Sequence, residues 1–295
     1  MVLAARRASA LEELARHCQA AGGPTLAVPT DVTDPAAMAE LAHPVEGFGR
    51  IDVWVNNAGV YLLGSLEATP PDAFRRVLET NFFGYVHGAR AVLPRFREQG
   101  HGVLINNASV YSHVGAPWLS AYLSSKFAVR GFSEALRQEL DDLPEVHVCT
   151  VSPSPSTRRS SPARPTTPAG RSRRHYPTYP PAQVARAIVA SALRPKRERI
   201  VGGAGRQLTL LEAMAPRLFE RVNRRYVDAL QFTAEPAPAT DGNLSAPQLQ
   251  QPRPDAWRRR RRPDPPIAVR RLVAAGLLAA GSLAIARIVT RSGRS

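Results

Sequence analysis

Short apolar runs rich in β-branched residues recur along this chain, and longer segments with apolar residues at helical spacing separate them. The runs are predicted to be strands at residues 1–5, 25–28, 51–55, 103–108, 146–151 and 199–203. The longer segments are predicted to be helices, including residues 71–98, 121–142 and 206–231. Strands that alternate with helices form a parallel sheet whose two faces the helices cover. The pattern therefore predicts an α/β fold with a doubly wound parallel sheet.

Two of the first helices carry start signals of different kinds. Ser9 and Glu12 have the spacing of a capping box, in which each side chain bonds to a backbone N–H near the helix start. Asp34 precedes Pro35, and an aspartate followed by a proline in the first turn is typical of a helix N-terminus. These signals predict where the helices after the first and second strands begin.

The candidate chemistry centres on Tyr122 and Lys126, which are four residues apart in a predicted helix. Side chains at this spacing share a helical face, so that the phenol and the ammonium can enter one site. A free phenol has a pKa of ~10, and a neighbouring cation favours the phenolate, which suits an acid/base catalyst near neutral pH. Of the 39 lysine and arginine side chains, only Lys126 and Lys196 are lysines. Ser109, at the end of an apolar run, is a candidate to hold a substrate oxygen beside the phenol.

A tyrosine–lysine pair at this spacing also occurs on the surface of ordinary amphipathic helices, so its companions decide between the two interpretations. In chain order the companions are Asp31-Val32, Asn56-Asn57-Ala58-Gly59, Asn81, Ser109 and Pro153. This ordered set resembles the classical short-chain dehydrogenase/reductase family, and the resemblance covers roughly residues 1 to 230. It implies a Rossmann-type sheet and an enzyme that transfers a hydride between a nicotinamide cofactor and a carbonyl or secondary alcohol of a small-molecule substrate.

The resemblance also implies a role for each companion of the pair. Tyr122 would be the general acid or base, and Lys126 would lower its pKa and bind the nicotinamide ribose. Ser109 would orient the substrate oxygen, and Asn81 would hold a water that links Lys126 to solvent. A homodimer or homotetramer is implied as the assembly, and no catalytic metal is expected.

Cofactor contacts are implied along the same strand ends. Asp31 and Val32 would meet the adenine, and the backbone of residues 57–59 would pass the ribose. The expected cofactor-binding residues are Arg6, Asp31, Val32, Asn57, Ala58, Gly59, Tyr122, Lys126, Pro153 and Thr157. NAD-preferring relatives carry an acid at the end of the second strand, where this chain has Ala5 followed by two arginines. Since a guanidinium attracts a 2′-phosphate that a carboxylate repels, NADP(H) is expected in preference to NAD(H), with ordinary arginines at a helix start as the alternative.

The family's first strand and its Gly-x-x-x-Gly-x-Gly turn have no counterpart here, because the chain begins at what resembles the second strand. In the strand order 3-2-1-4-5-6, strands at 1–5 and 25–28 would then lack the neighbour that joins them to 51–55. We expect that about 30 further residues, one βα unit, precede Met1 in the functional protein. N-terminal sequencing of native protein that returned Met1 would contradict this expectation. The alternative function is a noncatalytic or truncated relative that acts through its basic tail.

The net charge of +15 is confined to two segments. Residues 156–175 contain six arginines and no acid, and residues 251–295 contain eleven arginines and two aspartates, which gives +6 and +9 and leaves zero for the rest. Nucleic acid is therefore not expected as a partner of the catalytic body. Cys18 and Cys149 both lie in apolar periodic segments, which is typical of a cytoplasmic protein without disulfides.

Residues 154–181 are rich in proline, serine, threonine and arginine. In the family this region covers the substrate, and the alternative is a solvated loop. His113 and Trp118 are candidates either to line the substrate pocket or to pack in the core.

The chain is expected to divide into a dehydrogenase domain at 1–231, a Pro/Arg-rich linker at 232–266 and an apolar helix at 267–290. Residues 272–286 are uncharged and would span about 22 Å as a helix, short of the ~30 Å hydrocarbon core. Membrane contact through residues 258–289 and a helix that docks on a partner subunit are both compatible with this pattern. The arginine run before the apolar segment would keep the dehydrogenase domain in the cytoplasm.

Overall fold

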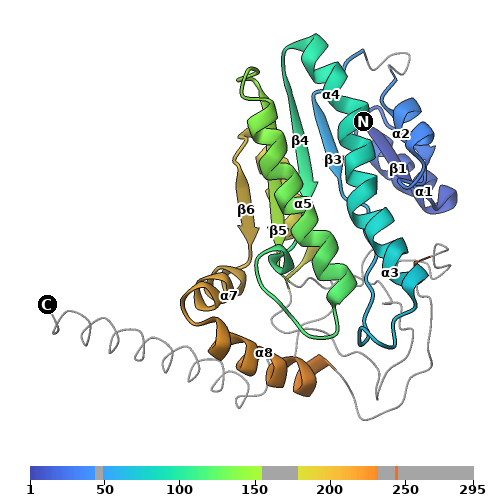
Figure 1. Ribbon diagram of the computed structural model, residues 1–295. Helices are drawn as coiled ribbons and strands as arrows, with labels where there is room; N and C mark the ends of the chain where they lie inside the picture. The colour runs from blue at the N-terminus through green and yellow to red at the C-terminus, as the bar shows by residue number, and fades with distance from the viewer. Residues whose placement is uncertain (44–48, 155–178, 232–242, 245–295) are drawn as a thin grey trace, which may run out of the picture.

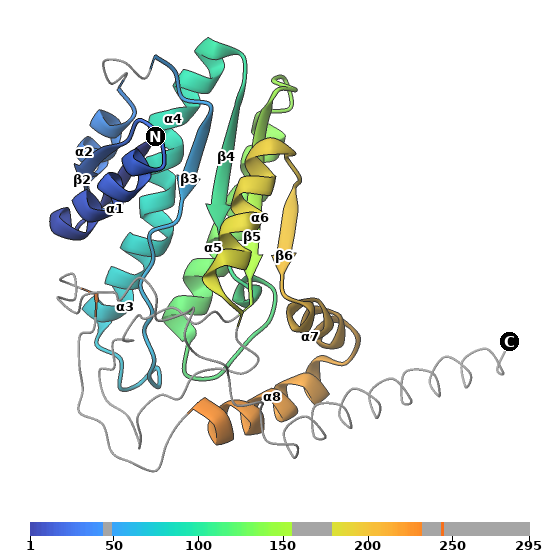
Figure 2. The same cartoon turned by 180° about the vertical axis from the view of Figure 1, so that it is seen from behind.

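The computed structural model describes residues 1–43, 49–154, 179–231 and 243–244. Parallel strands form the centre of the molecule, and helices lie on both faces (Figures 1 and 2). Several expectations lie outside the described residues. These are Thr157, the arginines of 156–175, the apolar helix at 267–290 and all of the linker except Asn243 and Leu244.

The described strands form two parallel sheets. β1 (Val2–Ala5) pairs with β2 (Leu26–Pro29), whereas a four-stranded sheet has the order β3-β4-β5-β6. Its members are β3 (Val53–Asn56), β4 (Gly102–Asn107), β5 (Val146–Pro153) and β6 (Glu198–Val201). The predicted α/β class with a parallel sheet is thus confirmed. The two sheets share no strand pairing among the described residues.

Helices cover the four-stranded sheet on both sides. The helices are α1 (Ala8–Ala20), α2 (Pro35–Leu41), α3 (Pro71–Leu78), α4 (Gly84–Gln99), α5 (Ser120–Glu139), α6 (Pro181–Leu193), α7 (Gly203–Met214) and α8 (Pro216–Gln231), with a π-helical turn at Glu79–Phe83 and a 3₁₀ turn at Val110–Ser112. Figure 1 shows α4 and α5 on one face, and Figure 2 shows α6 on the other. The long helices and the strands between them follow the predicted alternation.

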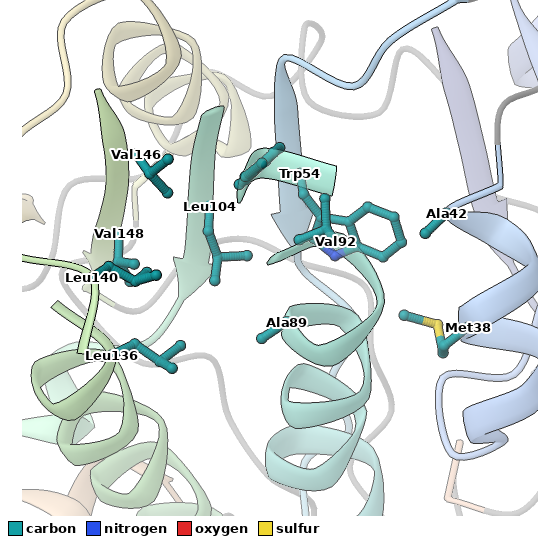
Figure 3. Packing of buried hydrophobic residues seen from close by; sticks show 11 residues of the cluster. Met38, Ala42, Trp54, Ala89, Val92, Leu104, Leu136, Leu140, Val146 and Val148 are labelled. Carbon is teal, nitrogen blue, oxygen red and sulfur yellow. The ribbon is translucent and has the colours of Figure 1, made fainter. Parts of the chain in front are cut away.

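The main core fills the space between the sheet and the layer of α4 and α5. Trp54 of β3, Leu104 of β4 and Val148 of β5 lie on the face of the sheet that meets Val92 of α4 (Figure 3). Met38 joins the same cluster from α2, whose residues also contact α4. Because α2 follows β2 in the chain, this packing holds the β1–β2 pair beside the larger sheet.

The two predicted helix starts had different outcomes. The Asp34 carboxylate accepts hydrogen bonds from two backbone N–H groups at the start of α2, so this N-cap is confirmed. The capping box at Ser9 and Glu12 is wrong, because α1 begins at Ala8 with Arg7 as its N-cap and without a side-chain cap. Ser9 therefore lies inside the first turn of the helix rather than before it.

The predicted helix at 206–231 is two helices, because Pro216 disfavours helical backbone at Ala215, whose ψ is 65°. α6 was not predicted, since its sequence follows a segment interpreted as a loop. Within residues 1–43, 49–154, 179–231 and 243–244, no helix combines the length and apolar character that crossing a membrane requires. In the same ranges no group of His, Cys, Asp and Glu side chains is arranged to hold a metal ion.

Candidate active site

The carboxyl ends of the parallel strands meet at one edge of the four-stranded sheet, the usual ligand-binding edge of an open α/β fold. The strand arrows in Figure 1 point toward this edge, where α3 and α7 lie. Asn56 is the last residue of β3, Asn107 of β4 and Pro153 of β5. The loops after β3 and β4 carry the Asn57–Gly59 segment and Ser109, so the fold brings these predicted site residues to one edge.

A buried chain of hydrogen bonds fixes the ends of β3 and β4. Asn56 Oδ1 accepts from Trp54 Nε1 at 2.8 Å, and Asn56 Nδ2 donates to Asn106 Oδ1 at 2.9 Å. Asn106 Nδ2 donates in turn to Ser133 Oγ on α5 at 2.9 Å. A Cβ atom on Gly88 of α4 would lie 2.3 Å from Asn56 Oδ1, so only glycine allows this close approach. The network sets the positions of both strand ends relative to α5.

Asn81 lies fully buried in the π-helical turn that joins α3 to α4. Its Oδ1 accepts from the Val60 N–H at 2.7 Å, and its Nδ2 donates to the Val60 carbonyl at 3.0 Å and to Ser125 Oγ at 3.0 Å. Such π-helical turns are frequent at functional sites. Asn81 therefore ties the loop after β3 to α5, the helix of the predicted tyrosine–lysine pair.

Lys126 is buried beneath this edge, with 4% of its surface exposed. Its ammonium donates to the Asn107 carbonyl at 2.9 Å, and the Tyr85 hydroxyl donates to the same oxygen at 3.0 Å. The Nζ atom also lies 5.1 Å from the centre of the Tyr85 ring and 5.9 Å from the centre of the Tyr122 ring. The ammonium is therefore held by a carbonyl and by aromatic faces, and Tyr122 and Lys126 lie on the same side of α5, as predicted.

Tyr122 is half-buried in an aromatic corner at the start of α5. Its ring meets Tyr61 edge to face, with centroids 4.9 Å apart, and Tyr111 with centroids 6.4 Å apart. Tyr61 follows the Asn57–Gly59 segment, and Tyr111 belongs to the 3₁₀ turn after β4. The two neighbours fix the plane of the phenol from both loops, although neither was singled out from the sequence.

Ser109 begins the turn that brings Tyr111 against the phenol. The serine is buried, its backbone is extended, and its Oγ accepts from the Tyr111 N–H at 3.2 Å. The Ser109 carbonyl accepts from Ser112 Oγ at 2.6 Å, which closes the turn. Since a hydroxyl that accepts one hydrogen bond can still donate its own hydrogen, Ser109 retains the capacity to hold a substrate oxygen.

The residues expected at the adenine side form a second cluster. Asp31 Oδ1 accepts from the Thr33 N–H and hydroxyl at 3.0 and 2.9 Å, and Arg76 Nη2 lies 3.2 Å from Asp31 Oδ2. Burial acts to raise the pKa of Asp31, but hydrogen bonds from Thr33 and the charges of Arg76 and Arg6 outweigh it and lower the pKa. Val32 packs against α4 beside Gly84. No sequence signal indicated Arg76, because its role depends on α3 passing the loop after β2.

The carboxyl end of β5 is tightly enclosed. Pro153 pairs with Val201 of β6, and the Ser154 N–H donates to the Val201 carbonyl at 2.9 Å. A Cβ atom on Gly205 would lie 2.5 Å from Ser154 Oγ, and one on Gly202, whose φ is 104°, would lie 2.9 Å away. The glycines therefore let α7 start directly beside the strand end, where Pro153 was expected to bind the cofactor.

The other two candidate pocket residues have structural partners. His113 Nε2 lies 2.7 Å from Glu198 Oε1 on β6, and Ser152 Oγ donates to the same oxygen at 2.8 Å. Trp118 donates its indole N–H to Asp228 on α8 at 2.8 Å. Both contacts hold the segment after Ser109 in place, so packing is the interpretation that the geometry favours for these two residues.

Comparison with known proteins agrees with this geometry. The family model described as short chain dehydrogenase matches residues 1–164. A Bacillus subtilis protein named uncharacterized oxidoreductase YxnA is 33% identical over 248 residues, which cover 80% of this chain and 68% of that protein. The chain belongs to the short-chain dehydrogenase family. Members of this family are enzymes that act on CH–OH groups with a nicotinamide cofactor and small-molecule substrates.

Solved structures show the same fold. A short-chain dehydrogenase from Streptomyces avermitilis is 26% identical, with a TM-score of 0.62, over 73% of this chain and 83% of that one. A short-chain dehydrogenase/reductase from Burkholderia phymatum, determined in complex with NAD, is 23% identical, with a TM-score of 0.64. The match covers 74% of this chain and 85% of that one. The short-chain dehydrogenase is thus an α/β oxidoreductase with a Rossmann-like parallel sheet.

Proposed function

We propose that this short-chain dehydrogenase transfers a hydride between NADP(H) and a carbonyl or secondary alcohol, with Tyr122 as the general acid or base. The observation that carries the proposal is the buried Lys126 ammonium on the same side of α5 as the Tyr122 ring, 5.9 Å from its centre. A cation at this distance favours the phenolate and so makes the phenol a better proton donor and acceptor near neutral pH. When bound, the nicotinamide supplies or accepts the hydride.

The remaining site residues position the reactants. Ser109 orients the substrate oxygen beside the Tyr122 hydroxyl, and Lys126 binds the nicotinamide ribose. Asn107 supports this assignment, because its Oδ1 is buried and has no hydrogen-bond partner among the described residues, so that it can accept from a ribose hydroxyl or a water. Asn81 holds the loop after β3 and a water that links Lys126 to solvent. Pro153 and Thr157 contact the nicotinamide side.

The adenosine end supports a preference for NADP(H) over NAD(H). Arg6 directly follows β1, where an acid would repel the 2′-phosphate. The Asp31 carboxylate is engaged by Thr33 and Arg76, which reduces its repulsion of a phosphate group. In this assignment Arg6 binds the 2′-phosphate, Asp31 and Val32 face the adenine, and the backbone of Asn57, Ala58 and Gly59 passes the ribose.

We further propose that residues 1–231 form the dehydrogenase domain of a cytoplasmic homodimer or homotetramer, with a linker at 232–266 and an apolar helix at 267–290. The charge and apolar pattern of 258–289 supports contact with an anionic membrane. Flotation of the full chain with vesicles that contain phosphatidylserine tests this contact. Protein that stays at the bottom of the gradient would favour docking of the helix on a partner subunit.

The proposed reaction is tested by following NADPH absorbance across a panel of aldehydes and ketones with the full chain. For any substrate that is reduced, Lys126→Met is expected to lower the rate by about 10²–10⁴-fold. Lys196→Met is the matched control, because it removes the only other lysine, an exposed side chain in the connection between α6 and β6. Equal rates for the two variants would overturn the role of Lys126. No turnover with either cofactor would favour a noncatalytic relative that acts through its basic tail.

A further inference from the structure

Two guanidinium groups from distant parts of the chain converge on a single backbone oxygen at the adenosine end. Arg6 follows β1, and Arg76 lies on α3. Arg6 Nη1 donates to the Leu244 carbonyl at 3.4 Å, and Arg76 Nε donates to the same oxygen at 3.3 Å. Arg6 Nη2 also donates to the Asn243 carbonyl at 2.9 Å. Residues 243 and 244 thus supply the acceptors for a two-arginine clamp.

The Leu244 side chain anchors this segment. It is 3% exposed and packs in an apolar cluster with Val60, Leu62, Val77 and Ala121. Val60 is the residue whose backbone Asn81 holds, and Ala121 precedes Tyr122. A short piece of the chain far beyond the last strand therefore lies against the loop after β3, between the adenosine end and the aromatic corner.

The clamp suits a stronger acceptor than a carbonyl. The charges of Arg6 and Arg76 outnumber that of the Asp31 carboxylate, which lies 3.2 Å from Arg76 Nη2. A phosphate monoester carries a charge of about −1.5 to −2 and offers three oxygens, so that it can bridge two guanidinium groups. A carbonyl offers one oxygen with only a partial charge. The carbonyls of Asn243 and Leu244 stand where two oxygens of such a phosphate would bind.

We propose that Arg76 completes, with Arg6, the clamp for the 2′-phosphate of NADP(H), and that the Asn243–Leu244 segment competes with this phosphate for the clamp. The inference rests on the proposed preference for NADP(H), to which it adds a second phosphate-binding residue and a built-in competitor. The segment and the phosphate bind alternately. If the segment occupied the clamp in about nine of ten molecules, the apparent affinity for the phosphate would be weakened about tenfold.

The test measures binding of 2′,5′-ADP and 5′-AMP to the full chain by calorimetry. These two nucleotides differ only in the 2′-phosphate and contain no nicotinamide. Leu244→Ser, which weakens the anchor of the segment, is expected to tighten binding of 2′,5′-ADP by up to about tenfold and to leave 5′-AMP unchanged. Arg76→Gln is expected to weaken the binding of 2′,5′-ADP by about tenfold and to leave the binding of 5′-AMP unchanged.

Each variant has a matched control. Arg75→Gln removes the same charge from the neighbouring, exposed position of α3, and Leu193→Ser changes a leucine that is 77% exposed at the end of α6. Neither control is expected to change binding of either nucleotide.

Several results would overturn the proposal. The segment does not compete with a 2′-phosphate if the Leu244→Ser variant binds 2′,5′-ADP no more tightly than wild type does. The same conclusion follows if the variant gains the same affinity for both nucleotides. If neither the wild type nor any variant binds 2′,5′-ADP more tightly than 5′-AMP, the proposed preference for NADP(H) is itself wrong. The proton-transfer role of Tyr122 is tested separately by turnover.

Discussion

Replacing Asn81 by alanine probes the connection between the loop after β3 and α5. The amide makes three hydrogen bonds, two with the N–H and carbonyl of Val60 and one with Ser125 Oγ. Its removal leaves both buried backbone groups of Val60 unsatisfied, at a cost of about 1–3 kcal/mol each. Ser125 is less affected, because its hydroxyl also donates to the Tyr122 carbonyl at 2.7 Å. We expect Asn81→Ala to lower the free energy of unfolding by about 3–5 kcal/mol.

Urea unfolding of the full chain, followed by circular dichroism, measures this loss of stability. The Tm should fall by about 2–4 °C for each kcal/mol lost. Asn223→Ala is the control, because it removes one exposed hydrogen bond, from Asn223 Nδ2 to the Gly115 carbonyl at 2.8 Å. This control is expected to stay within about 0.5 kcal/mol of wild type. If Asn81→Ala lost no more stability than the control, the hydrogen bonds of Asn81 would not be what connects the loop after β3 to α5.

Three further outcomes are expected. Gly88→Ala should destabilise the fold by about 1–3 kcal/mol in urea unfolding because its Cβ has no room, whereas Gly131→Ala, with open space around it on α5, should stabilise by about 0.5–1 kcal/mol. Burial acts to raise the pKa of Glu198, but hydrogen bonding, chiefly from His113, outweighs it and lowers the pKa. Its carboxylate therefore stabilises the fold above its ordinary pKa of about 4.3 and loses this contribution as the pH falls through the lowered value, so Glu198→Gln should show a shallower loss of stability in acid. Arg6→Gln should raise the KM for NADPH about tenfold and leave that for NADH unchanged in steady-state assays, and an equal rise for both would contradict a contact with the 2′-phosphate.

The sequence predicted features that depend on local spacing. The strands appear where β-branched runs occur, because such runs suit a sheet buried on both faces. Tyr122 and Lys126 share a face because i and i+4 positions of a helix always do. Asp34 caps α2 because its carboxylate needs only the next backbone N–H groups. These inferences require no knowledge of which distant segments meet.

Features that depend on tertiary contact were missed. Arg76 could not be recognised, because its partner Asp31 is 45 residues away and only packing of α3 brings them together. The contact of Glu198 with His113 likewise joins residues 85 apart. The capping box failed for a local reason, since α1 extends to Ala8 and places the serine inside the helix. A sequence motif therefore predicted the Tyr122–Lys126 pair, whereas the contacts that hold the two side chains in place could not be read from any motif.

The rate of NADPH consumption by the Tyr122→Phe variant of the full chain, measured beside its NADPH binding, tests the central claim most directly. Phenylalanine keeps the ring contacts with Tyr61 and Tyr111 and removes only the hydroxyl. The account predicts a rate lower by about 10²–10⁴-fold with NADPH binding retained, and a far smaller loss for Tyr61→Phe. A Tyr122→Phe enzyme that consumed NADPH at the wild-type rate would contradict the assignment of the phenol as the group that moves the proton.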